Sequence, residues 1–258
     1  PDKFFRLTHG GEVARLGGFL MNPNELGMLA VIGITMCFIE LRKYSSSLWT
    51  LIMLALMLYT LYLTGSRSSM IGFALITVYF VSKSNSRLLK ATSVIVAVLI
   101  IPVIFKTIFL KAGDLEEVLS MTGRIPFWKA LLTEALPQEP LFGFGFMRIY
   151  YTDYFESVHT YAAKMTHNTF IQVLLNLGFV GFTIVVLQMT FTFQAFKRTV
   201  SKEKKAIFIG VMIPILINSF TEFGIFGETN FGILFYQILI FSLVLRFNPE
   251  FTQIERLK

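Results

Sequence analysis

The sequence LWTLIMLALMLYTLYLTGSRSSMIGFALITVYFVS (48–82) consists of two apolar runs joined by a short polar turn. The runs, 48–64 and 68–82, contain no charged side chain, and the turn between them is TGSR (64–67). A helix needs about 20 mostly apolar residues to cross a lipid bilayer. The first run approaches this length, and the second is shorter. We therefore interpret the stretch as two membrane-spanning helices joined by a tight turn.

The same pattern continues along the chain, and the composition agrees with it. The 258 residues are 54% hydrophobic and 15% charged, with a mean hydropathy of +0.65. Soluble domains carry about 25% charged residues. We predict an all-α polytopic membrane protein with about seven transmembrane helices, at 24–41, 48–64, 68–82, 89–110, 168–196, 206–221 and 231–247. Pro102 and Pro214 are expected to kink the fourth and sixth helices.

The distribution of Lys and Arg among the short loops predicts the orientation. One set of loops contains ten such residues and the other only Arg67, so the first set is expected to be cytoplasmic. The predicted regions are an external segment 1–23, four transmembrane helices 24–110, an external loop 111–166, three transmembrane helices 167–247 and a cytoplasmic tail 248–258. The chain starts at Pro1 in a polar segment without a signal peptide, and we expect upstream spans to be missing.

The long external loop contains one predicted helix. In the segment 122–136, TGRIPFWKALLTEAL, apolar residues recur at helical spacing. They are Ile125, Trp128, Leu131, Leu132 and Ala135. We expect a short amphipathic helix that lies on the outer membrane surface or caps a cavity. The following PLFGFGF (140–146) combines two glycines with aromatic residues, which predicts a close-packed turn.

Several kinds of chemistry are not indicated. The net charge of +7 comes mainly from short loops between apolar runs, so no nucleic-acid partner is expected. The lone Cys37 excludes an intramolecular disulfide and a thiolate metal cluster. The sequence has no HExxH, P-loop, GxSxG or CxxC motif. We therefore predict no cofactor, and these motifs suggest no metal, although the acidic residues on the predicted external side do not exclude one.

Four basic groups stand where helix electrostatics would not favour them. Arg67, Arg124 and His167 lie at or just before predicted helix starts, and Arg15 lies a few residues upstream of one. A helix start already carries partial positive charge and unpaired N–H groups, so a cation there needs a neighbouring anion. The predicted topology puts all four on the external side, which indicates a phosphate-bearing ligand.

Each of these groups also has a simpler interpretation. An arginine at a membrane interface can extend its charge into water, and a histidine there can be merely polar. Glu222 and Glu228 flank a predicted external turn and could pair with one of the arginines. If His167 has a chemical role, the positive helix end should keep its ring neutral, and a neutral imidazole can accept a proton from a hydroxyl.

Several short motifs follow one another along the chain. They are RLGGF (15–19), NPNELG (22–27), TGSR (64–67), TGR (122–124) with Trp128, PLFGFG (140–145), and HN (167–168) followed by Gly178 and Gly181. In this order they resemble the O-antigen ligase and O-antigen polymerase superfamily of membrane glycosyltransferases, and the resemblance covers roughly residues 12–185.

The resemblance implies metal-independent glycosyl transfer at the external, periplasmic face of the bacterial plasma membrane. The donor would be a glycan on undecaprenyl pyrophosphate, and the acceptor a sugar hydroxyl on lipid A core, on another glycan or on a protein. Arg67 and Arg124 would bind the pyrophosphate, with Arg15 as a third candidate. His167 would be the catalytic residue that activates or orients the acceptor hydroxyl.

Two other functions are compatible with a polytopic membrane protein. A transporter or flippase of lipid-linked sugars usually carries charges near the middle of the membrane and related repeats. The apolar runs of this chain contain almost no central charges, and its polar groups gather on one side, which favours surface chemistry. A purely structural membrane subunit would leave the placement of the arginines unexplained.

Overall fold

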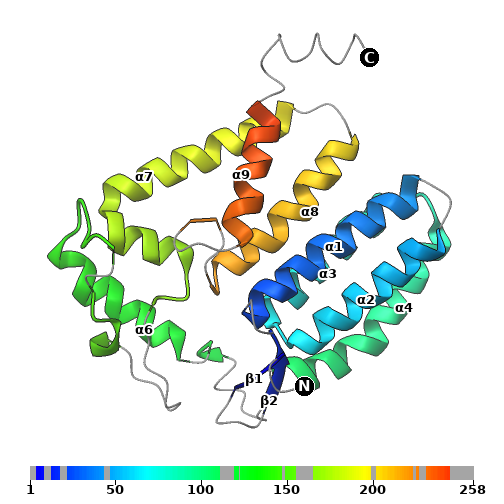
Figure 1. The fold of residues 1–258 in the computed structure, drawn as a ribbon, viewed down its shortest axis with the longest axis horizontal. Coiled ribbons are helices and arrows are strands. Elements are labelled where there is room, and N and C mark those ends of the chain that lie inside the picture. Colours follow the sequence, from blue (N-terminus) through cyan, green and yellow to red (C-terminus); the bar gives the residue numbers. More distant parts are fainter. Residues whose placement is uncertain are drawn as a thin grey trace.

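The computed structural model describes residues 4–8, 13–17, 22–43, 47–110, 119–121, 123–146, 149–154, 165–198, 202–222, 225–226 and 231–244. In these residues the chain is mainly helical, with one small sheet (Figure 1). The longer helices are α1 (Pro23–Lys43), α2 (Leu48–Thr64), α3 (Arg67–Ser82), α4 (Arg87–Ile104), α7 (Thr169–Arg198), α8 (Lys202–Ser219) and α9 (Phe231–Val244). A helix thus occupies each of the seven predicted apolar runs, with bounds that differ by a few residues.

Helix α1 is the centre of the bundle, because α2, α3, α8 and α9 all pack against it (Figure 1). Two apolar cores flank it. The core shared with α8 and α9 includes Met28, Ile32, Met212, Ile215 and Tyr236, and the core shared with α2 and α3 includes Val31, Ile34, Leu61 and Ile76. Gly210 of α8 allows a close approach, since a Cβ there would lie 1.9 Å from Cγ2 of Thr35. Small residues at such contacts are typical of helix packing in membranes.

Among the residues that the structure describes, three helical stretches are long and apolar enough to cross a membrane: Pro23–Arg42, Arg87–Ile108 and Thr169–Arg198. Three apolar helices in the same part of the chain are shorter, namely Leu48–Thr64, Arg67–Ser82 and Gly232–Phe241. The chain is therefore an α-helical membrane protein, and the number of seven spans stays a prediction. Pro102 and Pro214 lie inside α4 and α8.

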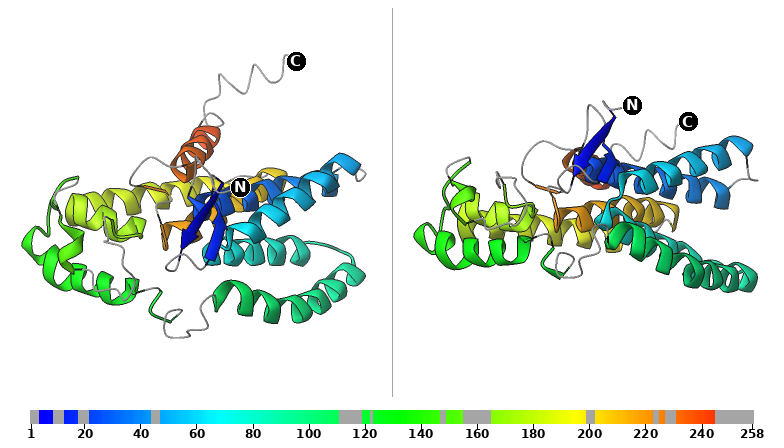
Figure 2. Two further views of the ribbon diagram at one scale, coloured as in Figure 1. Left: turned by 60° about the horizontal axis from the view of Figure 1, so that its bottom comes forward. Right: turned by 90° about the horizontal axis from the view of Figure 1, so that it is seen from below.

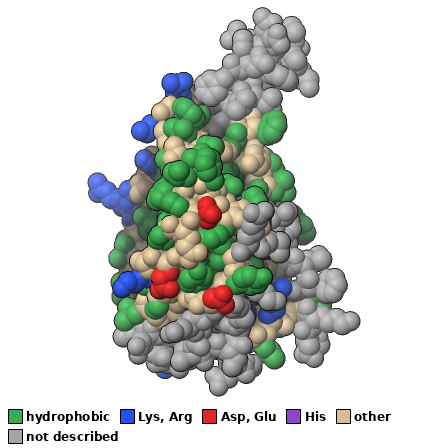
Figure 3. All heavy atoms as spheres, turned by 90° about the vertical axis from the view of Figure 1, so that its left-hand side faces the viewer, with side chains coloured by type: hydrophobic (Ala, Val, Ile, Leu, Met, Phe, Trp, Pro, Cys, Tyr) green, Lys and Arg blue, Asp and Glu red, His purple; other side chains and the backbone are tan. Residues whose placement is uncertain are grey.

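Helix α4 shows what surrounds the bundle. It lies at the edge of the bundle beside α3 and continues into the π-helical turn η1 (Phe105–Phe109) (Figure 2). Its apolar side chains face outward; Val98 is 66% exposed and Leu99 is 67% exposed. Hydrophobic side chains are also spread over the face seen in Figure 3. Outward-facing apolar surfaces of this kind indicate contact with the hydrocarbon of a lipid bilayer.

Helix α7 is broken at Gly178, which the uninterrupted apolar run 168–196 did not predict. Gly178 has φ 63° and ψ −166°, and the chain changes direction there (Figure 1). The turn at 140–145 fills the break through four hydrogen bonds: Phe144 N to Leu175 O (2.8 Å), Gly145 N to Asn176 O (2.9 Å), Phe179 N to Pro140 O (2.9 Å) and Val180 N to Leu141 O (3.1 Å). The backbone groups released by the break are thus paired, as a buried backbone requires. The close-packed turn predicted at 140–146 is confirmed.

The predicted amphipathic helix is present, and it buries part of the predicted apolar set. Helical structure runs through α6 (Arg124–Ala130), η2 (Leu131–Ala135) and η3 (Leu136–Gln138). Phe127, which the predicted apolar set omitted, is buried together with Leu131 and Ala135, four and eight residues further on. Positions at this spacing share one helix face, which packs against the first part of α7. Ile125 and Leu132 are 46% and 38% exposed, so contact of this pair with the membrane surface stays a prediction.

The predicted external segment contains a two-stranded hairpin that the sequence did not indicate. Strands β1 (Phe5–Thr8) and β2 (Val13–Leu16) pair antiparallel, with Arg6 opposite Arg15. The hairpin lies at the start of α1 (Figure 2). It fixes Arg15 near the end of α2, which β2 contacts.

Candidate functional site

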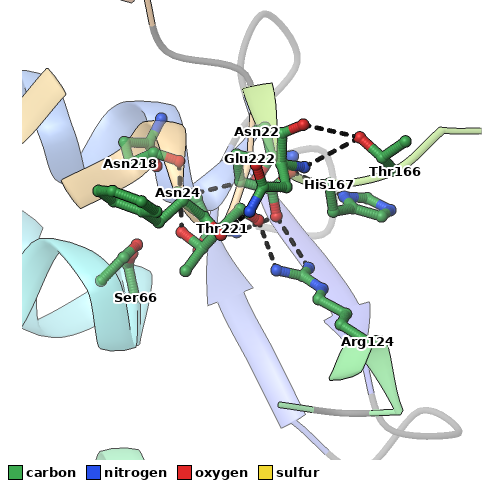
Figure 4. Close-up of polar contacts among 12 residues, drawn as sticks. Asn22, Asn24, Ser66, Arg124, Thr166, His167, Asn218, Thr221 and Glu222 are labelled. Carbon is green, nitrogen blue, oxygen red and sulfur yellow. Dashed lines mark hydrogen bonds and ion pairs between the residues drawn. The ribbon is translucent and has the colours of Figure 1, made fainter. Parts of the chain in front are cut away.

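Polar residues gather at one end of the bundle, where several helices begin or end (Figure 4). Helices α1 and α3 begin there, α2 and α8 end there, and the segments before α6 and α7 join them. Other basic residues lie at the far ends of α1 and α3, where Arg42 Nη2 donates to the Lys83 carbonyl (3.3 Å). The charged groups of the bundle are thus divided between its two ends.

The carboxylate of Glu222 is the centre of this polar end (Figure 4). The residue follows α8 and is only 5% exposed. Its Oε1 accepts hydrogen bonds from Asn24 Nδ2 (2.8 Å) and Arg124 Nη2 (3.0 Å), and its Oε2 lies 2.9 Å from His167 Nδ1. Arg124 also donates to the carbonyl of Thr221. One carboxylate therefore joins four segments that are distant in the sequence.

Glu222 is ionised at neutral pH in spite of its burial. Burial by itself would raise the pKa of this carboxyl group. The hydrogen bond and charge of His167, together with those of Arg124, outweigh burial and lower the pKa from 4.5 to about 2. The geometry supports this direction, because three donors meet the two carboxylate oxygens.

The segment before α7 holds His167 in place. His167 has φ 51°, a left-handed conformation in which histidine is enriched among non-glycine residues. Asn168 caps α7: its Oδ1 accepts from the backbone N–H groups two and three residues on (3.0 and 3.1 Å), and its Nδ2 donates to the Phe220 carbonyl (3.3 Å). Thr169 Oγ1 donates to the carbonyl of Glu222 (3.2 Å). The start of α7 is therefore fastened to the end of α8.

Arg15 reaches the same cluster through Asn24. Its Nη2 donates to Asn24 Oδ1 (2.7 Å), and its Nε donates to the carbonyl of Thr64 at the end of α2 (2.8 Å). Because the oxygen of the Asn24 side chain faces Arg15, its amide nitrogen faces Glu222. The hairpin, through Arg15, thus helps to hold the side chain of Asn24 in its orientation.

Arg67 is the first residue of α3, as predicted. Ser66 is the N-cap, since its Oγ accepts from the backbone N–H of Ser69 (3.3 Å). Ser69 Oγ donates to the carbonyl of Asn24 (3.3 Å), which ties α3 to α1. Arg67 Nε donates to the carbonyl of Ile108 in η1 (3.3 Å).

Positive charge exceeds negative charge among the charged groups that act on Arg15 and Glu25 at this end. This set consists of Arg6, Arg15, Glu25, Arg67, Arg124 and Glu222. Four guanidinium groups in the set thus stand against two carboxylates, apart from any charge on His167. Burial lowers the pKa of Arg15 to about 10, with Glu222 acting against this shift and the two neighbouring arginines adding to it. Such an excess favours the binding of an anion.

The described residues offer no ready metal site, since no three of their His, Cys, Asp or Glu side chains lie together. The groups that this end does offer are guanidinium donors for an anion and one imidazole. Guanidinium groups can bind an anion, and an imidazole can act in proton transfer.

The structure joins three of the four predicted site residues through Glu222, a group that the prediction had treated as optional, whereas Arg67 is near enough for its charge to act on Arg15. Arg124 and His167 meet at Glu222, and Arg15 is one hydrogen bond further away. The suggested pairing of Glu222 with an arginine is confirmed for Arg124, whereas Glu228 lies outside the described residues. The expectation of a neutral histidine considered only the helix end, and the structure adds an ionised carboxylate beside the ring.

Sequence reasoning missed Asn24 as a member of the site. It had appeared only within the motif NPNELG (22–27), with no role of its own. Its amide joins Arg15 to Glu222, a residue 198 positions away. The available signal was a polar residue at the very start of the first predicted run, 24–41.

Comparison with known protein families gives one match. The family model described as O-antigen ligase matches residues 52–186, just over half of the 258-residue chain. The matched region includes Arg67, Arg124 and His167, whereas Arg15 and Glu222 lie outside it. Among curated proteins, none matches the chain. The match over more than half of the sequence shows that the chain belongs to the O-antigen ligase family.

Proposed function

We propose that the protein is a membrane glycosyltransferase that moves a glycan from undecaprenyl pyrophosphate to an acceptor sugar hydroxyl, as an O-antigen ligase or polysaccharide polymerase. The observation that carries the proposal is the convergence of Arg15, Arg67 and Arg124 with His167 at one polar end of an apolar bundle. An excess of fixed cations beside one imidazole suits a substrate with an anionic leaving group and a hydroxyl nucleophile.

On the donor side, Arg67 and Arg124 bind the pyrophosphate, with Arg15 as the third candidate. When the bond between the anomeric carbon and the pyrophosphate oxygen breaks, negative charge grows on that oxygen. Guanidinium groups stabilise this charge and can contact two phosphate oxygens at once. One such donor is worth about 3 kcal/mol of the activation barrier. In this proposal the arginines do the work without a metal.

On the acceptor side, His167 accepts the proton of the attacking hydroxyl. The hydroxyl oxygen forms the new bond to the anomeric carbon, and undecaprenyl pyrophosphate leaves from the opposite face. A positioned base contributes about 10²–10⁴-fold to the rate. Attack opposite the leaving group inverts the anomeric configuration.

The polar end faces the exterior of the bacterial plasma membrane in this proposal. Support comes from the opposite end, where the basic residues of the short loops lie, among them Arg42, Arg87 and Lys202. An excess of Lys and Arg marks the cytoplasmic side of a membrane protein.

The test uses the full-length protein in vesicles with a lipid-linked donor and a hydroxyl-bearing acceptor. We expect wild type to transfer the glycan, with inversion, in the presence of a chelator. His167→Asn should be inserted normally and transfer nothing. Asparagine tolerates the left-handed backbone and can still donate to Glu222, but it is not a base. Movement of donor across the bilayer without transfer would instead indicate a flippase and overturn the proposal.

A further inference from the structure

We propose that Glu222 is a positioning residue that selects the tautomer of His167 and leaves Nε2 as the atom that accepts the acceptor's proton. The inference rests on the proposed function and deepens it. It assigns a role to a residue outside the region matched by the family, which ends at residue 186. Glu222 itself contacts neither substrate in this scheme.

The geometry fixes which ring nitrogen carries hydrogen. Oε2 of Glu222 lies 2.9 Å from Nδ1 of His167, which is hydrogen-bond distance. An ionised carboxylate can only accept hydrogen bonds, so Nδ1 must be the donor. In the neutral ring, the lone pair is then on Nε2. A base needs that lone pair. In the opposite tautomer Nε2 would carry a hydrogen and could not accept a proton.

The orientation of the carboxylate is itself fixed. Its other oxygen, Oε1, is occupied by Asn24 Nδ2 (2.8 Å) and Arg124 Nη2 (3.0 Å), so Oε2 is the oxygen directed at His167. Arg15 donates to Asn24 Oδ1 (2.7 Å) and thereby prevents the amide from turning its oxygen toward Glu222. The hairpin, through Arg15, supports the orientation of the imidazole on the other side of the site.

A merely structural role for Glu222 makes a different prediction. In that case any side chain of the same shape that holds α8 to α7 would serve. Glu222→Gln keeps the shape but has one oxygen where the site needs two acceptors. If its NH₂ group faces His167, Nδ1 must accept and Nε2 becomes protonated. If its oxygen faces His167, the NH₂ group meets the donors of Asn24 and Arg124.

The expected effect is therefore on catalysis. In the Ser–His–Asp triad, the amide replacement that leaves the geometry intact but gives the wrong tautomer lowers kcat about 10⁴-fold. For Glu222→Gln we expect kcat to fall by about 10²–10⁴-fold, with much less change in the KM of the acceptor. Loss confined to KM would show that Glu222 acts only on binding and would overturn the inference.

The decisive measurement is the protonation state of the ring nitrogens. Full-length protein labelled with ¹⁵N-histidine is examined in bilayers by solid-state NMR, and the His167 signals are assigned by their absence in His167→Asn. In wild type, the neutral ring should carry hydrogen on Nδ1 and none on Nε2, and in Glu222→Gln the pattern should reverse. Hydrogen on Nε2 of the neutral wild-type ring would overturn the inference, even if the glutamine variant did not fold.

Glu25→Gln is the matched control. Glu25 is a partly buried carboxylate at the same end of the bundle, and it accepts from the backbone N–H of Asn22 (3.4 Å). This variant should keep the wild-type kcat and the wild-type tautomer. The inference and the proposed function fail in different ways. Turnover by His167→Asn would show that His167 is not the base and would overturn the proposed function. An inactive His167→Asn together with a fully active Glu222→Gln would overturn only the positioning role of Glu222.

Discussion

Gly143 and Gly178 lie back to back, and neither position has room for a side chain. A Cβ on Gly143 would lie 2.6 Å from the backbone nitrogen of Gly178, and a Cβ on Gly178 would lie 2.3 Å from the carbonyl carbon of Leu141. Both residues also have positive φ, 68° and 63°. The turn at 140–145 and the break in α7 therefore form one backbone-to-backbone unit, and α6 packs on the same part of α7.

Replacement of Gly178 by alanine should destabilise the fold by about 2 kcal/mol or more, because a left-handed backbone and a backbone clash coincide there. Thermal unfolding in detergent, followed by circular dichroism, measures the effect. The control is Gly72→Ala in α3, where the new Cβ would meet only Pro214 Cα at 3.6 Å. Equal melting temperatures for the two variants would contradict the prediction.

Replacement of Arg67 by glutamine should lower kcat/KM for the lipid-linked donor by about 100-fold, as expected for the loss of one donor to the transition-state charge. Arg67 is the sharpest choice because its loss leaves the contacts of Glu222 with Arg124 and His167 in place. Initial rates with radiolabelled donor give the value. Arg42→Gln, at the far end of α1, should behave like wild type, and an equal loss in both variants would show a general charge effect instead.

Asn168→Ala should cost about 0.5–2 kcal/mol of stability, the range measured for loss of an N-cap. Glycan transfer should fall as well, since the cap residue also ties the His167 segment to the Phe220 carbonyl. Ser86→Ala is the comparison: Ser86 caps α4 through the Leu89 N–H (3.1 Å) at an exposed position away from the site. It should lose some stability and no activity. Normal transfer by Asn168→Ala would show that the hydrogen bond from Asn168 to the Phe220 carbonyl is not needed for activity.

The stability that Glu222 contributes should depend on pH in the acid range. Its folded-state pKa of about 2 is lower than the ordinary 4.5, so the contribution is complete above pH 4.5 and is lost as pH falls toward 2. A shift of this size corresponds to about 3 kcal/mol. The melting temperatures of wild type and Glu222→Gln, measured from pH 7 downward, should therefore converge in that window. A constant difference would mean that the carboxylate does not titrate there.

The helices could be predicted from the sequence because their signal is local. Long apolar runs such as 48–64 need no tertiary partner to be recognised, and the observed helix α2 has the same bounds. The break at Gly178 gave no such signal, since glycine is common in membrane helices. It depends on the turn at 140–145, which supplies the missing hydrogen bonds. The hairpin was missed because its strands are only four residues long and because their position depends on contacts with α1 and α2.

The site was predictable in its basic residues and not in its connections. Arg67, Arg124 and His167 could be selected because each stands at a predicted helix start. The contacts of Glu222 join residues that are 55, 98 and 198 positions apart, and only the packing of the helices brings them within hydrogen-bond distance. The predicted topology placed these groups on one side of the membrane. It did not predict that they contact the same carboxylate.

The length of α1 gives the depth at which the reaction would take place. Its 21 residues, at 1.5 Å per residue, extend about 31 Å, which matches the hydrocarbon core of a bilayer. Asn24 stands at one end of this helix, so in the proposed orientation Glu222 and the groups around it are expected at the level of the lipid headgroups. The pyrophosphate of the proposed donor is expected at the same level. A donor could therefore react while its hydrocarbon tail stays dissolved in the membrane, with no energy spent on extracting it.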